Sequence, residues 1–533
     1  MPSRVVVLSG PIACGKSSLV GQLVARFAFL LVKTHELIRA VSPGVPAERA
    51  ALQKAGEALD KQTKGQWVAD SLVRRLARES ESAPVVVDSV RIKEQIDALR
   101  RAYGRSVIHV HLTAPIEELR RRYKDRAGSI AELPSYDEAL KDPTEAQVDS
   151  LREVADVVID THRNAKEDVV ERVASCLQLY GRGVIPLVDV LVGGQWGSEG
   201  KGHIASHLAP EYAVLVRVGG PNAGHTVFAE PEHEVFHHLP SGSRRAPKAA
   251  LVLGPGSVLR TDGLLEEIVK HEIDVRRLTI DPQAMLIEDS DKEEEGKAGM
   301  QKAIGSTLQG VGMATARKVL RPAAKPAVRL ARDEPRLAPY VRPALDVLER
   351  AYTAGDRVLL EGTQGTGLSL HHGLYPYVTS RDTTASGCLA EVGIPPGRVR
   401  RVVMVCRSYP IRVGGNSGPM GIEIPWQEVA DRSGNSVDDL VRAEKTTTTK
   451  RDRRVAEFGW REYRRASVLN GPTDIALTFA DYLDVRNRDA RRFEQLTPPT
   501  IRLIEELERV AGAPVSLIAT RFHFRSIIDR RKW

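Results

Sequence analysis

Two glycine-rich stretches contain the residue types that bind phosphate groups. The first is Gly10-Pro-Ile-Ala-Cys-Gly15-Lys16-Ser17, and the second is Gly193-Gly-Gln-Trp-Gly-Ser-Glu-Gly-Lys-Gly202. Glycines allow successive backbone N–H groups to turn toward one anion, a lysine adds positive charge, and a serine hydroxyl can ligate Mg²⁺. Both stretches therefore predict binding of a nucleoside triphosphate.

The residues around the first stretch predict a phosphate loop between a strand and a helix. Residues 4–9 (RVVVLS) are β-branched, and residues 17–27 have helical apolar spacing. Lys16 would reach the β- and γ-phosphates, Ser17 would ligate Mg²⁺, and Gly10 and Gly15 would shape the loop. Further strands are expected at 84–88, 106–112 and 154–160, with helices at 93–103, 115–126 and 166–179. This alternation predicts an α/β domain with a parallel sheet over residues 1–182, followed by a flexible junction at 181–183.

The rest of residues 1–182 resembles the nucleoside monophosphate kinases, especially the small deoxynucleoside monophosphate kinases. The resemblance implies that Asp88 contacts Mg²⁺ and that Arg91 contacts the acceptor phosphate. It also implies that Arg122 and Arg126, on a basic helix, neutralise the transferring phosphoryl group. A solvated helix face for the arginines and a helix cap for Asp88 are the alternatives.

The second half carries four motifs beyond its glycine loop. They are GGPNAGHT (219–226), IGSTLQGVG (304–312), EGTQGT (361–366) and HGLYPYVTS (372–380). Their order, spacing and identity resemble adenylosuccinate synthetase across nearly all of residues 187–533. The resemblance implies a second α/β domain, which begins with a buried strand at 186–192. Within it, the charged residues 289–302 are expected to form a mobile loop.

The adenylosuccinate synthetase reaction needs a base, an acid and cations. The purine 6-oxo group loses the N1 proton, is phosphorylated by a nucleoside triphosphate, and is displaced by the aspartate amine. The resemblance implies His225 as general acid, Lys201 at the γ-phosphate, and the Gly224 carbonyl on Mg²⁺. It assigns nucleotide binding to Gly197, Glu199, Gly200, Gly202, Asn222, Thr226, Thr307, Gln364, Thr379 and Asp481, with Gln364 also catalytic. It assigns aspartate binding to Thr449, Arg451 and Arg453. Arg321 would reach a neighbouring subunit's site, which implies a homodimer.

Ser198 departs from the family, which carries its catalytic aspartate at this position. A serine hydroxyl has too high a pKa to take the N1 proton, and it is a weaker Mg²⁺ ligand than a carboxylate. The smaller side chain leaves space for a 2-amino group, which could donate to the hydroxyl oxygen. The substitution resembles the 2-aminoadenylosuccinate synthetase branch, whose members use dGMP. It favours dGMP or GMP over IMP, and the alternatives are ordinary IMP-dependent synthesis and a silent nucleotide sensor. The replacement base, Glu199 or the bound aspartate's own carboxylate, stays open.

The phosphoryl-donor pocket also departs from the family. Phe479 stands where the family has a lysine that reads guanine, although Asp481 is kept, and Thr520-Arg521 replaces threonine-glycine. Loss of the lysine removes a donor to the guanine 6-oxo group, so ATP or dATP is expected, with GTP as the alternative.

Composition limits the remaining function classes. The 77 Lys+Arg against 69 Asp+Glu give a net charge of +8, which nucleotide substrates explain. The sequence has no zinc finger and no basic stripe interleaved with aromatic residues, which argues against nucleic acid as a partner. The four cysteines form no CxxC pair, and no apolar run approaches the roughly 18 residues of a membrane span. We expect a cytoplasmic enzyme that does not bind membranes.

Overall fold

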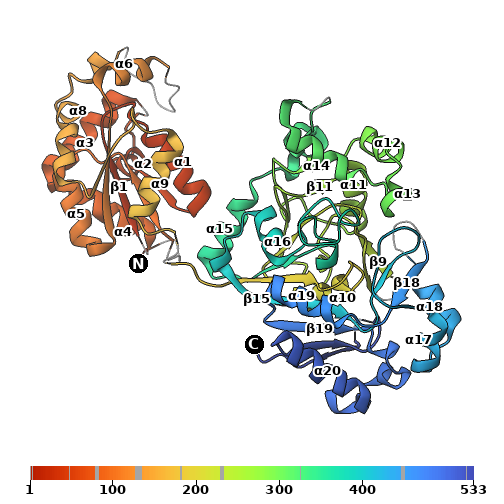
Figure 1. The fold of residues 1–533 in the computed structure, drawn as a ribbon. Coiled ribbons are helices and arrows are strands. Elements are labelled where there is room, and N and C mark those ends of the chain that lie inside the picture. The colour runs from red at the N-terminus through yellow and green to blue at the C-terminus, as the bar shows by residue number, and fades with distance from the viewer. Residues whose placement is uncertain are drawn as a thin grey trace. The chain divides into compact units, whose positions relative to one another are not determined.

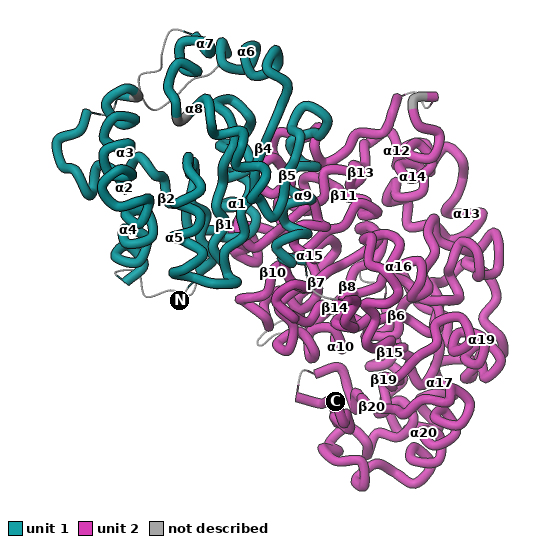
Figure 2. Tube along the Cα trace, turned by 90° about the vertical axis from the view of Figure 1, so that its left-hand side faces the viewer, with its two compact units in different colours: residues 1–182 teal, residues 183–533 magenta. Residues whose placement is uncertain are grey.

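The structure is a computed structural model. It describes residues 2, 4–46, 48–77, 83–125, 135–180, 183–228, 233–323, 326–445, 451–523 and 525–533. The chain forms two compact units, Met1–Arg182 (unit 1) and Gly183–Trp533 (unit 2), which Figure 2 shows in different colours. Residues 181–182 of the predicted junction lie outside the described residues.

Unit 1 is a five-stranded parallel sheet with the strand order β2-β3-β1-β4-β5 and helices on both faces (Figure 1). Side chains alternate along β1, so Val5 and Val7 pack toward α2 to α5, whereas Val6 and Leu8 pack toward α1, α6 and α9. The strands are β1 Val5–Ser9, β2 Leu30–Lys33, β3 Val85–Asp88, β4 Val107–Thr113 and β5 Val157–Asp160. The helices are α1 Lys16–Phe27, α2 Thr34–Val41, α3 Arg49–Thr63, α4 Gln66–Leu76, α5 Lys93–Tyr103, α6 Ile116–Lys124, α7 Tyr136–Ala139, α8 Pro143–Gln147 and α9 Lys166–Cys176.

The predicted strand at 154–160 begins three residues later than expected. Residues 148–154 form a 3₁₀ helix instead, and this helix turns Val148 and Leu151 into the core. The predicted strand therefore included Val154, the last residue of this helix, and the two residues that connect the helix to β5.

Unit 2 is built on a nine-stranded sheet with the order β12-β10-β7-β14-β6-β15-β19-β20-β21, in which every pairing is parallel except that of β20 with β21. These strands are β6 Val188–Gly193, β7 Val214–Arg217, β10 Ala250–Leu253, β12 Leu278–Ile280, β14 Val358–Glu361, β15 Val399–Arg407, β19 Asp474–Thr478, β20 Val515–Ala519 and β21 Ile527–Asp529. The smaller sheets contain β8 His225–Phe228 with β9 His233–Phe236, β11 Val258–Leu259 with β13 Met285–Leu286, and β16 Ile411–Val413, β18 Arg453–Ala456 and β17 Glu423–Ile424. The predicted α/β class with mostly parallel sheets is confirmed.

Apolar cores lie on both faces of the large sheet. Val190 and Val192 belong to one core and Leu191 to the other, because neighbouring side chains of a strand point to opposite faces. The helices of unit 2 are α10 Lys201–Leu208, α11 Thr261–Lys270, α12 Asp289–Lys297, α13 Met300–Ile304, α14 Val311–Leu320, α15 Ala344–Ala354, α16 Ala385–Val392, α17 Trp426–Ser433, α18 Val437–Ala443, α19 Trp460–Asn470 and α20 Pro498–Ala511.

The prediction of a mobile charged loop at 289–302 is wrong, because these residues form α12 and α13. Two of the acidic side chains are buried and bonded. Glu295 accepts hydrogen bonds from the N–H groups of Gly310 (2.9 Å) and Gly312 (3.1 Å), and Asp291 pairs with Arg317 (2.5 Å). The two carboxylates therefore hold α14 and the residue before it, Gly310, in place.

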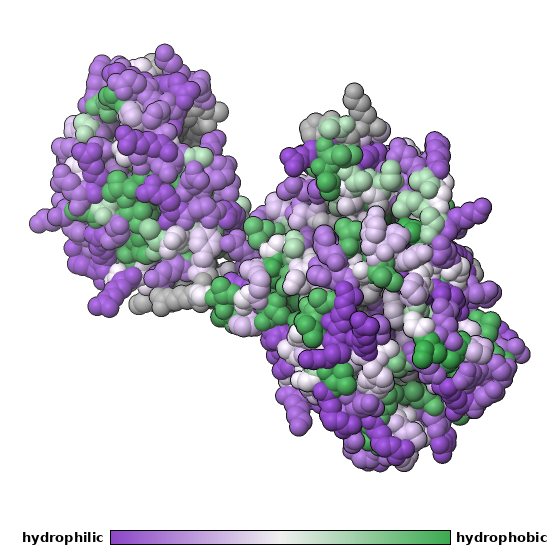
Figure 3. Space-filling model, viewed as in Figure 1, coloured by the Kyte–Doolittle hydropathy of each residue, from purple (hydrophilic) through white to green (hydrophobic). Residues whose placement is uncertain are grey.

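Hydrophilic side chains cover most of the face shown in Figure 3, with apolar groups in small patches. Within the described ranges, no helix is long and apolar enough to cross a membrane.

Candidate nucleotide and aspartate site

A cavity of about 240 Å³ in unit 2 brings together segments that are far apart in the sequence. Its wall includes eight of the predicted site residues: Gly197, Ser198, Asn222, Gly224, Thr307, Gln364, Thr379 and Arg453. Of the other predicted residues of unit 2, Glu199, Gly200, Lys201, Gly202, His225, Thr226, Arg321, Arg451 and Asp481 are not part of this wall. Thr449 lies outside the described residues.

The phosphate loop of unit 2 is organised around a buried carboxylate. Glu199 is fully buried and accepts hydrogen bonds from the N–H groups of Gln195 (3.0 Å) and Gly197 (2.8 Å). The Lys201 ammonium pairs with the other carboxylate oxygen at 2.6 Å. A Cβ on Gly365 would lie 2.4 Å from Glu199, so only glycine fits there. Glu199 thus supports the loop from inside and does not face the cavity.

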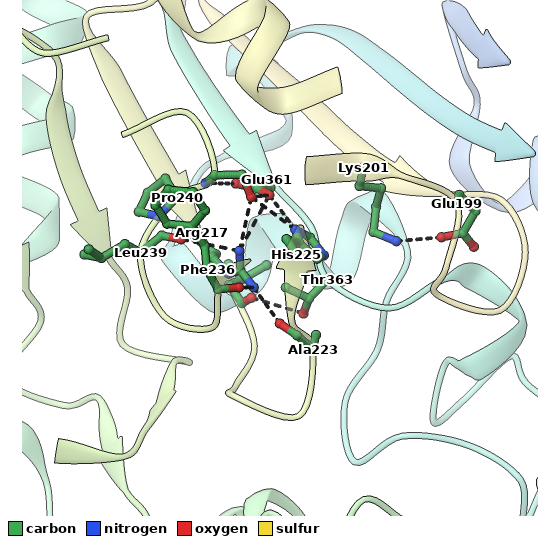
Figure 4. A network of polar contacts seen from close by, with 12 residues as sticks. Glu199, Lys201, Arg217, Ala223, His225, Phe236, Leu239, Pro240, Glu361 and Thr363 are labelled. Carbon is green, nitrogen blue, oxygen red and sulfur yellow. Dashed lines mark hydrogen bonds and ion pairs between the residues drawn. The ribbon is translucent and has the colours of Figure 1, made fainter. Parts of the chain in front are cut away.

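His225, at the start of β8, is held in a network of buried polar groups (Figure 4). Because a carboxylate can only accept, His225 Nδ1 donates to Glu361 Oε1, at 2.5 Å. The Ser241 N–H donates to the other Glu361 oxygen at 2.8 Å, and Arg217 lies 3.7 Å from Glu361. Among the described residues, Nε2 of His225 has no hydrogen-bond partner. The imidazole is therefore oriented through Nδ1, which leaves Nε2 for a ligand.

Burial lowers the pKa of His225 to about 4, and Arg217 acts in the same direction, while the hydrogen bond to Glu361 opposes both. Without a bound ligand, the His225 imidazole is therefore neutral at pH 7, with its proton on Nδ1. Phosphate groups beside Nε2 would raise this pKa, because they stabilise the charged form. Protonated in this way, Nε2 becomes a donor to a phosphoryl oxygen.

The amide of Gln364 has a fixed orientation at the cavity wall. Its Nε2 donates to Asn222 Oδ1 (3.0 Å), and its Oε1 accepts from the Thr363 hydroxyl (2.8 Å) and from Arg381 (3.3 Å). Gln364 has a φ of 57°, which is uncommon outside glycine. The Gln364 amide is therefore preorganised.

Arginines mark the region predicted to bind aspartate. Arg453 lines the cavity and pairs with Glu444 at 3.0 Å, and its Nε has no partner among the described residues. Arg451 donates to the carbonyls of Gly414 (2.6 Å) and Gly305 (3.4 Å). Arg412, which was not predicted, also lines the cavity.

The predicted donor side has an aromatic wall. A small hollow is lined by Gly200, His203, Thr478, Phe479, Ala519, Arg521 and Phe522. The neighbouring Asp481 is 5 % exposed, and burial raises its pKa to about 6. One carboxylate oxygen of Asp481 has no hydrogen-bond partner in the part of the chain that is described. A base that donates from an amino group would satisfy this oxygen.

The residues around the cavity do not form a complete metal site. Ser198 offers a hydroxyl and Gly224 a carbonyl, and no cluster of three or more His, Cys, Asp or Glu that could hold a metal exists among the described residues. Mg²⁺ characteristically binds through few protein ligands plus substrate phosphates. Mg²⁺ held here would therefore depend on the nucleotide phosphates.

The phosphate loop of unit 1 lies between β1 and α1, as predicted from the sequence. Gly10 and Gly15 have φ values of 133° and 100°, and a Cβ on Gly10 would lie 2.1 Å from the carbonyl oxygen of Leu112. The Lys16 ammonium donates to the carbonyls of Gly10 (2.7 Å) and Pro11 (2.9 Å). A nucleotide would have to draw Lys16 away from these carbonyls.

The predicted phosphoryl-binding arginines of unit 1 are paired with carboxylates. Arg91 pairs with Glu145 at 2.5 Å, and Arg122 pairs with Glu118 at 2.6 Å. Arg126 lies outside the described residues, and Asp88 ends β3.

A second cavity, of about 430 Å³, lies in unit 1. It is lined by Pro11, Thr113, Ala114, Pro115, Ile116, Leu119, Tyr136, Leu140, Glu145, Ala146, Asp149, Arg152 and Asp160.

Sequence comparison accounts for most of the chain. The model of the adenylosuccinate synthetase family matches residues 190–335 and 324–488. The adenylosuccinate synthetase of Pyrococcus sp. (strain ST700) is 40% identical over 349 residues, which are 64% of this chain and 98% of the relative. The chain belongs to the adenylosuccinate synthetase family. A second family model, described as an AAA domain, matches residues 5–157.

Two solved structures of synthetases share the fold of unit 2. The succinoaminodeoxyadenylate synthetase of cyanophage S-2L, bound to dGMP and to dATP as an energy donor, is 30% identical. It covers 65% of this chain and 96% of its own, with a TM-score of 0.54. The fully ligated adenylosuccinate synthetase from Plasmodium falciparum has a TM-score of 0.56 at 22% identity and covers 66% of this chain and 100% of its own. The second comparison shows the fold alone.

Sequence reasoning missed several buried charges of the synthetase unit. Glu361 is the first residue of the EGTQGT motif, but the motif alone does not indicate that Glu361 orients His225. Arg217 and Arg407 end β7 and β15. In a parallel α/β sheet, ligands bind beyond the carboxyl ends of the strands. A charged residue at the end of an apolar strand was therefore a usable signal.

Proposed function

We propose that unit 2 condenses L-aspartate with a 6-oxopurine nucleoside monophosphate, with dGMP or GMP favoured, at the expense of a nucleoside triphosphate. The observation that carries this proposal is Ser198 in the wall of the cavity. There it faces the same space as Asn222, Thr307 and Arg453. Family membership supports the ligase reaction, and Ser198 supports the choice of purine.

The 2-amino group of guanine is the feature that Ser198 would recognise. Glu295 is the only carboxylate among the cavity-lining residues of the described chain, and both of its oxygens already accept backbone N–H groups. A hydroxyl beside the base can accept from an amino group without a charge. The related cyanophage enzyme, whose structure holds dGMP, supports this assignment.

The proton from N1 needs an acceptor other than Ser198. Glu199 is tied to Lys201 and to two backbone N–H groups, so its carboxylate does not reach the cavity. The remaining candidate is a carboxylate of the bound aspartate. In this scheme the 6-oxygen attacks the γ-phosphorus as the N1 proton moves to that carboxylate, and the bond between the γ-phosphorus and its bridging oxygen breaks to release the nucleoside diphosphate. The aspartate amine then attacks C6, the C6–O bond breaks, and the departing phosphate takes up the proton that the amine loses, while His225 donates to the phosphoryl oxygens.

The proposed phosphoryl donor is ATP or dATP, with GTP as the alternative. Phe479 supplies no donor to a guanine 6-oxo group, and the buried Asp481 carboxylate can accept from the amino group of either base, so the loss of the lysine carries this choice. The donor named for the cyanophage structure is dATP. Mg²⁺ would neutralise charge on the phosphates when it is bound.

Unit 1 is proposed to be a nucleoside monophosphate kinase, and the whole chain a homodimer. The glycine loop with Lys16 and Ser17 supports the first proposal. For the second, Arg321 follows α14, where the neighbouring apolar side chains of Val319 and Leu320 are 71 % and 58 % exposed. Exposed apolar patches are typical of protein interfaces.

Binding of a matched ligand pair tests the role of Ser198. dGMP and dIMP differ only in the 2-amino group. One hydrogen bond predicts that dGMP binds roughly 3- to 10-fold more tightly than dIMP by calorimetry, and that this preference disappears in Ser198→Ala. Equal affinities in the wild type, or a preference that survives the substitution, would refute the assignment. Preference for dIMP would favour the IMP-dependent alternative, and binding without any turnover would favour the silent sensor.

A further inference from the structure

Glu444 is a buried carboxylate that connects the predicted aspartate site to the phosphate loop of unit 2. It follows α18 and precedes residues 446–450, and it is 3 % exposed. Nothing in its sequence context distinguishes it from the surface acids of α18, such as Asp438 and Asp439. The structure separates Glu444 from them by burial and by its partners.

Three side chains donate hydrogen bonds to this one carboxylate. Arg407 donates at 2.7 Å and Tyr482 at 2.9 Å to Oε1, and Arg453 donates at 3.0 Å to Oε2. Burial alone would raise the pKa of Glu444, but the charges of Arg407 and Arg453 outweigh it and hold the pKa at about 2. Glu444 is therefore ionised, and two guanidinium groups share its single negative charge.

The two arginines contact different parts of the site. Arg453 lines the cavity and has an Nε without a partner among the described residues. Arg407 is 1 % exposed, exchanges two hydrogen bonds between its backbone and the Gln195 amide (3.0 and 3.1 Å), and donates to the Ser198 carbonyl at 3.2 Å. A continuous path of charged hydrogen bonds thus runs from the cavity through Glu444 to the phosphate loop.

We propose that Glu444 is a positioning residue that couples binding of L-aspartate to binding of the nucleoside triphosphate. The inference rests on the proposed ligase function. A substrate carboxylate at Arg453 competes with Glu444 for the same guanidinium, because the arginine charge is then shared between two anions. Glu444 can in turn interact more strongly with Arg407, which holds the carbonyl of Ser198. Occupation of the aspartate site is in this way transmitted to the loop that binds the triphosphate.

The coupling is measurable as a linkage. In the full chain, calorimetry gives the affinity for the β,γ-imido analogue of whichever triphosphate, ATP or GTP, supports turnover, with and without saturating L-aspartate. Coupling predicts at least a 5-fold difference in the wild type, a usual size for coupled sites, and by reciprocity the same factor for aspartate. In Glu444→Gln we expect the two ligands to bind independently. The KM for aspartate should rise roughly 10-fold, because a Gln amide has only one accepting oxygen and cannot hold the guanidinium groups of both Arg407 and Arg453 in position. Glu444→Asp, which keeps the charge, should restore part of the coupling.

Glu423→Gln is the matched control. The Glu423 side chain is 40 % exposed and pairs with Arg454, the residue after Arg453, and within the described part of the chain it makes no hydrogen bond or ion pair with the phosphate loop. We expect this variant to keep the wild-type coupling. The inference about Glu444 would be overturned if the coupling between the two ligands persists in Glu444→Gln, or if the wild-type enzyme forms product but shows no coupling. Either result would leave the proposed ligase function intact. A wild type that joins aspartate to no 6-oxopurine nucleotide would instead overturn the proposed function.

Discussion

Replacement of Glu361 with Gln tests how the site orients and charges His225. The substitution keeps the shape of the side chain but removes the negative charge that His225 Nδ1 (2.5 Å) and Arg217 (3.7 Å) face. Because an amide NH₂ can take the place of the carboxylate opposite Nδ1, the histidine proton loses its fixed location. The Arg217 guanidinium, 2 % exposed, keeps only neutral partners.

Glu361→Gln should lower both the stability of the protein and its rate. Removing one partner of a buried charge pair lowers the free energy of unfolding by about 3–5 kcal/mol. We therefore expect the urea concentration at the midpoint of unfolding of the full chain to fall, as followed by tryptophan fluorescence. A mispositioned general acid costs about 10²- to 10⁴-fold in kcat. The general acid must be protonated, and loss of the carboxylate lowers the pKa of His225. The high-pH limb of the kcat profile should therefore move to lower pH.

Glu267→Gln provides the control for stability. Glu267 is also buried and accepts from a histidine, His238 Nδ1, at 3.3 Å, but His238 is not one of the predicted site residues. We expect a similar loss of stability with an unchanged kcat profile. If Glu361→Gln keeps the wild-type limb and rate, His225 is not the general acid that the geometry describes.

Three further substitutions test other parts of the account. Ser198→Asp should lower the rate with dGMP at least 10-fold and raise turnover of IMP, measured by product formation, and unchanged rates with both would contradict the pocket assignment. Lys16→Ala should abolish phosphorylation of monophosphates by unit 1 while the ligase rate stays within about 2-fold, and loss of both activities would contradict independent sites. Gly365→Ala should destabilise unit 2 by about 1–3 kcal/mol in urea unfolding, because its methyl group would meet Glu199, and unchanged stability would contradict the packing of the loop.

The sequence predicts those parts of the fold that are determined by residues close together in the chain. The β1 to α1 and β6 to α10 segments combine apolar strands, glycines and helical spacing within about 25 residues, so both phosphate loops could be located from the sequence. The adenylosuccinate synthetase motifs located further residues of the cavity wall, and two of these motifs, 219–226 and 361–366, lie at the ends of β7 and β14 of the large sheet.

The parts that sequence did not predict depend on contacts between distant residues. The acidic residues of α12 look like solvent-exposed charges until Glu295 meets the backbone of Gly310, which is 15 positions away. Glu444 and Arg407 are 37 positions apart, and Ser198 lies 209 positions from Arg407. Tertiary packing decides whether a charged side chain is exposed or is buried against such a partner. The pattern of neighbouring residues in the sequence does not show this.

Aspartate-dependent product formation, followed by mass spectrometry, tests whether unit 2 joins aspartate to a 2-aminopurine nucleotide. IMP, GMP and dGMP are supplied in parallel, each with ATP and with GTP, and a reaction without aspartate is the control. We predict a 2-amino succinyl product from dGMP or GMP, formed faster with ATP than with GTP. Turnover of IMP alone would contradict the role of Ser198 and would indicate an ordinary IMP-dependent adenylosuccinate synthetase. No product from any of the three nucleotides would contradict the ligase function itself.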